Sequence, residues 1–171
     1  MIYGNPNDFA IWFDVVPEWS NPEFIEGVFT IFIDGRILLD EKIRDSATLQ
    51  VQLGDCDLIL SNLKNYHGNA KTDFSNEDLY FRADHPRYIV DSDVVDNDLE
   101  PEGVEVAPMI VKDTGWDVYL FGAGDEERLI YSKDEGKTVF EKRLARGTVE
   151  KVLRSLPKLD DFQHINIMGS V

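Results

Sequence analysis

The N-terminal part of the chain has the apolar–polar alternation of β-strands. Apolar side chains recur at every second position over residues 8–16, which predicts a strand with both faces partly buried. A second apolar run, residues 27–33, leads through Asp34-Gly35 into a third, residues 36–39. Asp-Gly between apolar runs favours a type I′ hairpin turn, because both central residues of that turn need positive φ. These three runs are therefore expected to form an antiparallel meander that ends near residue 40.

The same pattern predicts five further strands. Each is a short apolar or alternating run bounded by turn-forming residues. They span residues 48–53, 104–111, 116–121, 127–131 and 139–144. Pro108 in the second of these indicates a sheet edge or a bulge, since proline cannot donate a hydrogen bond to a neighbouring strand.

Start and stop signals predict three helices. A short helix with a leucine stripe follows Asp57 as its cap. A second begins after Ser75, with carboxylates in its first turn, and stops before Pro86. An amphipathic helix near the C-terminus has Thr148 as its N-cap and Pro157 as its terminator.

These elements predict a sheet-dominated α+β fold of mostly antiparallel strands and hairpins, with two or three short helices. A length of 171 residues fits one domain. We expect that domain to span residues 1–160. Residues 161–171 are expected to form a tail, with Ile165, Ile167 and Met168 available to pin it as a short strand.

Charge narrows the range of partners. The chain has 33 acidic and 17 basic residues, so its formal net charge is -16. Nucleic acids and anionic membrane surfaces attract proteins through Lys and Arg, so both are disfavoured as direct partners. A charged partner is expected to be basic.

The acidic residues are concentrated in one segment, residues 91–105. It contains no Lys or Arg and seven carboxylates: Asp91, Asp93, Asp96, Asp98, Glu100, Glu102 and Glu105. Their spacing is not that of an EF-hand, because Val95 occupies the fifth position of a loop that begins at Asp91. Three interpretations remain open: a solvated acidic loop, a docking surface for a basic protein, and an irregular metal site.

A second polar segment has a structural interpretation. Ser132, Asp134, Gly136 and Thr138 alternate between two apolar runs, where short side chains can bond to loop amides and glycine can take positive φ. The pattern is similar to the Asp-box hairpin of sialidases, although Val139 stands where that motif has an aromatic residue. In those proteins the box is a turn away from catalysis, so a structural hairpin is expected here.

No catalytic, metal or cofactor site is predicted. The chain has neither a G-x-S-x-G elbow nor a P-loop, and His67, His85 and His164 have no zinc-site spacing. Cys56 lies between Asp55 and Asp57, whose charges disfavour a thiolate, so a small core residue is expected. A hydrolase using scattered carboxylates stays open as an alternative, as does an acidic scaffold protein.

The compartment is predicted from what the sequence lacks. Its first residues have no basic cluster followed by an apolar run, and no stretch of 18 apolar residues occurs. With a single cysteine, an intrachain disulfide is impossible. These observations favour the cytoplasm.

Several segments in order along the chain resemble the immunity protein 42 family. They are Met1-Ile2-Tyr3-Gly4-Asn5-Pro6, Phe9-Ala10-Ile11, Val16-Pro17-Glu18-Trp19, the hairpin strand ending at Ile33-Asp34-Gly35, Leu129-Ile130-Tyr131-Ser132, and Gly147-Thr148-Val149-Glu150-Lys151-Val152-Leu153. The resemblance implies a cytosolic bacterial antidote that is not an enzyme. Such proteins bind and block the cognate toxin domain of a contact-dependent inhibition or other polymorphic toxin system.

The resemblance and the charge together give a specific expectation. A nuclease toxin, RNase in the first instance, has a basic groove for phosphate, which an acidic protein can occupy. The expected toxin-binding residues are Asp91, Asp93, Asp96, Asp98, Glu100, Glu102, Asp125, Glu126 and Glu127, with Trp116 as a candidate anchor. For Trp116, an ordinary core position is the alternative.

Overall fold

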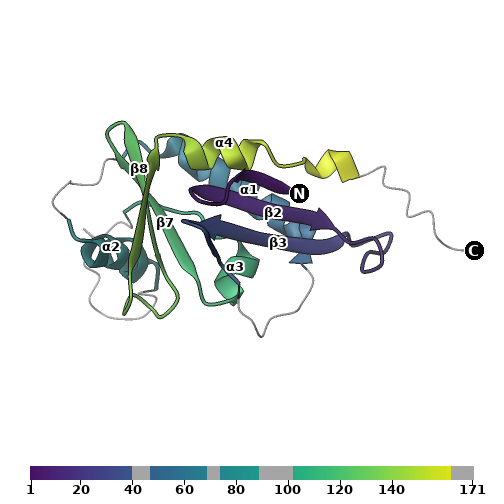
Figure 1. The fold of residues 1–171 in the computed structure, drawn as a ribbon, viewed down its shortest axis with the longest axis horizontal. Coiled ribbons are helices and arrows are strands. Elements are labelled where there is room, and N and C mark those ends of the chain that lie inside the picture. Colours follow the sequence, from purple (N-terminus) through teal and green to yellow (C-terminus); the bar gives the residue numbers. More distant parts are fainter. Residues whose placement is uncertain (40–46, 69–73, 89–101, 163–171) are drawn as a thin grey trace, which may run out of the picture.

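The computed structural model describes residues 1–39, 47–68, 74–88 and 102–162, which form two antiparallel sheets and four α-helices (Figure 1). Sheet A contains β1 (Ile2–Asn5), β2 (Phe9–Val15), β3 (Glu26–Ile33), β4 (Arg36–Ile37) and β5 (Ala47–Thr48). Its order is β1-β2-β3-β4, and β5 also pairs with β3. The α+β, sheet-rich single domain is as predicted.

The predicted meander is confirmed as β2, β3 and β4. Asp34 has φ 53° and Gly35 has φ 74°, the positive values expected for this turn. The structure adds β1, which pairs antiparallel with β2 and was not predicted. Its sequence, Ile-Tyr-Gly-Asn, is too short and too polar to show a period of two.

Sheet B contains β6 (Val104–Glu105), β7 (Asp117–Ala123), β8 (Glu126–Ser132) and β9 (Phe140–Ala145), in that order. Its strand pairs are all antiparallel. The last three strands confirm the predictions over residues 116–121, 127–131 and 139–144.

The predicted strand over residues 48–53 is wrong, because α1 (Leu49–Asn65) begins there. Leu49, Leu53 and Cys56 are buried at helical spacing, whereas Val51, which the alternation would place beside Leu49 and Leu53, is 45% exposed. The leucine stripe expected after Asp57 is the second half of this same helix, so Asp57 is not a cap.

The predicted strand over residues 104–111 is wrong beyond β6. Proline is well suited to a helix start, since the first amides of a helix have no partner inside it. Accordingly, Pro108 is the N-cap of α3 (Met109–Asp113), and its carbonyl accepts hydrogen bonds from the amides of Val111 and Lys112. Two short elements thus replace one long strand.

Helix α2 (Asn76–Tyr88) extends past Pro86, where the sequence predicted its end. A proline at this position leaves the carbonyl of Arg82, four residues earlier, without its usual helical donor. The amide of Glu102 donates to this carbonyl at 3.2 Å. A long-range contact therefore replaces the hydrogen bond that proline removes.

The C-terminal helix is α4 (Thr148–Arg154), and the prediction that Thr148 caps it is wrong. The N-cap is Gly147, with φ 83°, while the Thr148 hydroxyl donates to the carbonyl of Ala145 at 2.6 Å. A 3-10 turn, η1 (Leu159–Phe162), follows. The strand suggested for Ile165 to Met168 lies outside the described residues.

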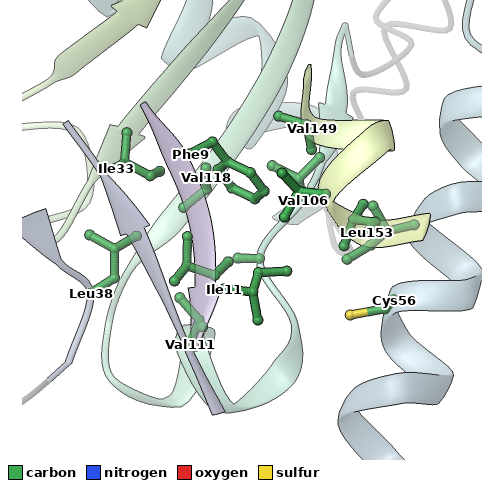
Figure 2. Close-up of a cluster of buried hydrophobic side chains, with 14 of the residues drawn as sticks. Phe9, Ile11, Ile33, Leu38, Cys56, Val106, Val111, Val118, Val149 and Leu153 are labelled. Atoms are coloured by element: carbon green, nitrogen blue, oxygen red, sulfur yellow. The ribbon is translucent and has the colours of Figure 1, made fainter. Parts of the chain in front are cut away.

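One core joins the two sheets with α1 and α4. Figure 2 shows Phe9 and Ile11 of β2 beside Val118 of β7, with Val149 of α4 and Cys56 of α1 completing the cluster. A second cluster lies on the other face of sheet B, where Leu79, Tyr80 and Ala83 of α2 pack on Tyr119, Phe121 and Ile130. The two central strands of sheet B, β7 and β8, are thus buried on both faces, which explains the nearly continuous apolar run of β7.

Candidate functional site

The described end of the acidic segment is fixed to α2. Arg82 Nη1 donates to Glu102 Oε1 at 2.9 Å, in addition to the backbone contact between the same two residues. Both side chains are more than a third exposed, so this ion pair adds little stability. Asp91, Asp93, Asp96, Asp98 and Glu100 lie outside the described residues.

Asp125 and Glu126 lie at the turn between β7 and β8, and both side chains are exposed. Glu126 Oε2 is 3.5 Å from Arg143 Nη1, a surface ion pair. The carbonyl of Asp125 accepts from the Arg146 amide at 3.0 Å. The turn therefore presents two carboxylates to solvent on a hydrogen-bonded backbone.

Two of the expected toxin-binding residues, Glu127 and Trp116, are buried and so are not accessible to a partner. Glu127 is 3% exposed, and its buried carboxylate is satisfied by α4: Oε2 accepts from the Gly147 amide at 2.9 Å and Oε1 from the Val149 amide at 2.8 Å. Burial raises the pKa of Glu127, while the α4 amides act in the opposite direction. Trp116 is 6% exposed and belongs to the main core.

The segment from Ser132 to Thr138 is a closed turn. The Ser132 hydroxyl donates to Asp134 Oδ1 at 2.9 Å and accepts from the Gly136 amide at 3.0 Å. Asp134 accepts from the amide and the hydroxyl of Thr138, each at 2.7 Å, and these bonds lower the pKa of Asp134. A Cβ on Gly136 would lie 2.6 Å from the Tyr80 ring, so the turn also fits closely against α2.

Two tyrosine–aspartate pairs, which the sequence did not indicate, attach α2 to sheet B. Tyr80 donates to Asp117 Oδ2 and Tyr119 donates to Asp84 Oδ1, each at 2.7 Å. Burial raises the pKa of Asp117, against the effect of the Tyr80 hydroxyl. Burial, followed by the bond to Asp84, raises the pKa of Tyr119 far above its usual range. The spacing of Tyr80 and Asp84, one turn apart on α2, is the only sequence signal for this arrangement.

Nucleophilic and metal chemistry have little support in the described part. Cys56 is buried, and burial together with the neighbouring aspartates raises its pKa to about 12, so the thiol stays protonated. Within residues 1–39, 47–68, 74–88 and 102–162, no group of three or more His, Cys, Asp or Glu side chains has metal-binding geometry. His67 is exposed, the side chain of His85 is not described, and His164 lies outside the described residues.

A cavity of about 430 Å³ lies between α1 and the C-terminal end of α4. Aliphatic side chains and Cys56 form most of its lining, with Asp57, Arg154 and Lys158 as the charged members. Its one thiol, Cys56, is the protonated group described above, and the described residues of the lining include no histidine to act as its base. The described helices also include none that is long and apolar enough to cross a membrane.

A comparison with protein-family models identifies the class to which this chain belongs. The class is that of immunity proteins, since the family model for immunity protein 42 matches residues 1–159. The chain belongs to the immunity protein 42 family, which confirms the resemblance seen in its sequence.

A solved structure is similar over most of its length. It is described as the crystal structure of CdiI from Burkholderia dolosa AUO158, and it aligns with a TM-score of 0.70 and 26% sequence identity. The alignment covers 90% of this chain and 96% of the CdiI chain. A comparison with curated proteins gives no match.

Proposed function

We propose that this protein is the antidote of a contact-dependent growth inhibition or related polymorphic toxin system, and that it neutralises its cognate toxin domain by binding it in the cytoplasm. The observation that supports this proposal most strongly is the family match over residues 1–159, together with the similarity to CdiI over nearly the whole of both chains. An antidote of this kind acts by occupancy and needs no catalytic residue.

Charge supports a basic nuclease, in the first instance an RNase, as the toxin. A nuclease needs a cationic groove for phosphate, and a protein with net charge -16 competes for such a groove by the same attraction. Complementary fields also accelerate encounter, toward about 10⁸ M⁻¹s⁻¹ at low salt.

The contact surface we propose consists of the acidic segment and the β7–β8 turn. Its members are Asp91, Asp93, Asp96, Asp98, Glu100, Glu102, Asp125 and Glu126. The exposed carboxylates of Asp125 and Glu126, and the anchoring of Glu102 on α2, support this choice. Trp116 and Glu127 are not included because both are buried.

The antidote function is tested by growth rescue. Cells that express the cognate toxin domain should stop growing, and co-expression of this chain should restore growth. A toxin domain that still arrests growth in the presence of soluble chain would contradict the proposal.

The contact surface is tested by neutralising charge. A variant with Asp91, Asp93 and Asp96 changed to Asn should associate with the toxin domain roughly tenfold more slowly at low ionic strength. Its association rate should also depend less on salt concentration. A control with Asp57, Asp113 and Asp160 changed to Asn removes the same charge at exposed positions on other elements. Equal effects of the two variants would show that net charge acts without this surface.

A further inference from the structure

The connection between β2 and β3, residues 16–25, exposes two large aromatic side chains. Trp19 and Phe24 are each 50% exposed. Figure 1 shows this connection at the end of the molecule opposite to α2. We call it the aromatic loop, and it contains none of the residues of the acidic surface proposed above.

The aromatic loop is held rigidly by hydrogen bonds within it. Asn21 Oδ1 accepts from the amides of Glu23 and Phe24, each at 2.9 Å, and the Asn21 amide donates to the Phe24 carbonyl at 2.9 Å. The Ser20 hydroxyl joins the two arms of the loop, donating to the Val16 carbonyl at 3.0 Å and accepting from the Glu26 amide at 2.9 Å. The backbone that presents both rings is therefore ordered before any partner arrives.

Helix α1 fixes the loop to the body of the protein. Gln50 Oε1 accepts from the Ile25 amide at 3.0 Å, and Gln50 Nε2 donates to the Glu23 carbonyl at 3.3 Å. Ile25 packs against the main core. Because ordering a loop on binding costs free energy, a preformed loop with exposed aromatic rings is well suited to act as a binding anchor.

Charge indicates the chemistry of the partner. Residues 1–35 contain six acidic side chains and no Lys or Arg. Glu18 and Glu23 are exposed next to Trp19 and Phe24 in sequence, and no Lys or Arg in the described part forms an ion pair with either. A complementary surface has an apolar pocket with a cationic rim, where Arg or Lys can also stack on the indole. A second copy of this chain is a poor fit, since two chains with net charge -16 repel each other.

We propose that the aromatic loop is a docking site for the cognate toxin domain, with Trp19 and Phe24 inserted into an apolar pocket and Glu18 and Glu23 facing its basic rim. The identity of the partner rests on the proposed function, whereas the site does not depend on the acidic segment. In this arrangement the net charge accelerates encounter, and burial of the two rings slows dissociation.

The test measures binding of the purified cognate toxin domain to the full chain. The Trp19→Ala variant should bind about 30-fold more weakly, and Trp19→Ala with Phe24→Ala more weakly still, mainly through faster dissociation. Trp19→Phe should retain most of the affinity. The control is Leu58→Ala, which removes a 62% exposed apolar side chain from α1 and should change nothing.

Charge reversal provides a second variant that leaves the loop's hydrogen bonds in place. Glu18→Lys with Glu23→Lys should weaken binding at least tenfold, whereas Asp57→Lys with Asp113→Lys should have a smaller effect. Wild-type affinity in the Trp19 and Phe24 variants, or an equal loss in Leu58→Ala, would overturn this inference and leave the proposed function standing. Failure of the wild-type chain itself to bind the toxin domain would overturn both.

Discussion

At the scale of single residues, Glu127 shows that a carboxylate in an acidic run can be structural. Asp125, Glu126 and Glu127 are consecutive in sequence, but the alternation of β8 turns Glu127 inward, where it accepts from two amides at the start of α4. The sequence reveals the charge of the run but not this role, because the amides belong to residues about twenty positions later. Trp116, the candidate anchor, is also buried, and burial cannot be predicted from residue type alone.

The Glu127→Gln variant tests this structural role through pH. Burial raises the pKa of Glu127 in the folded protein above the ordinary value of 4.5, which the unfolded chain retains. At a pH between the unfolded and the folded pKa, the folded protein therefore holds a proton that the unfolded chain has lost. The stability from this proton is complete below about pH 4.5 and is lost as pH rises through the folded pKa. Glutamine does not titrate, so the free energy of unfolding of wild type relative to the variant should fall as pH rises.

Urea denaturation of both proteins, from about pH 4 to about pH 8, provides the measurement. Asp117 also has a raised pKa, but it titrates in both proteins and cancels in the difference. A difference that stays constant across this range would contradict the assignment of Glu127 as a buried carboxylate with a raised pKa.

At the scale of elements, the best predictions came from strands with local turn signals. The Asp34-Gly35 turn fixes the register of its hairpin, and β7, β8 and β9 lie where their apolar runs predicted them. The two wrong strands have one physical cause. Short apolar runs fit a strand and a buried helix face equally well, and tertiary packing decides between them.

The sequence predicted helix α2, but it did not predict the contacts that attach this helix to sheet B. The helix contacts sheet B through the pairs Tyr80–Asp117 and Tyr119–Asp84, which are separated by 37 and 35 residues in sequence. No local pattern encodes such pairings. The prediction that α2 stops before Pro86 failed for a similar reason, since the distant Glu102 amide supplies the hydrogen bond that Pro86 cannot donate.

Removing both tyrosine hydroxyls should loosen α2 selectively. We expect Tyr80→Phe with Tyr119→Phe to lower the free energy of unfolding by about 1.5–3 kcal/mol for each hydroxyl removed, because each change deletes one hydrogen bond to a carboxylate. Hydrogen exchange should accelerate at α2 amides and remain unchanged in the β2–β3 hairpin. Tyr3→Phe, a hydroxyl deletion in sheet A, is the control, and unchanged protection of α2 in the double variant would contradict the role of these pairs.

At the scale of the whole molecule, the sequence determines the charge, and the fold determines which charged and aromatic groups reach the surface. Net charge and family membership follow from the sequence, and they support a cationic toxin as the partner. Which groups are exposed and which are buried can be known only from the fold. Two acidic residues of the expected surface pair with the protein's own arginines, and two expected contact residues are buried. The aromatic loop becomes visible as a candidate anchor only when its exposure and its hydrogen bonds are known.

The central claim is that this protein inhibits by binding and carries out no reaction of its own. The most direct measurement is RNA and DNA degradation by the cognate toxin domain, which we propose to be a nuclease, at increasing concentrations of the purified chain. We expect the chain alone to leave both substrates intact and to abolish degradation at a fixed molar ratio to the toxin. Continued degradation at excess chain would contradict the account.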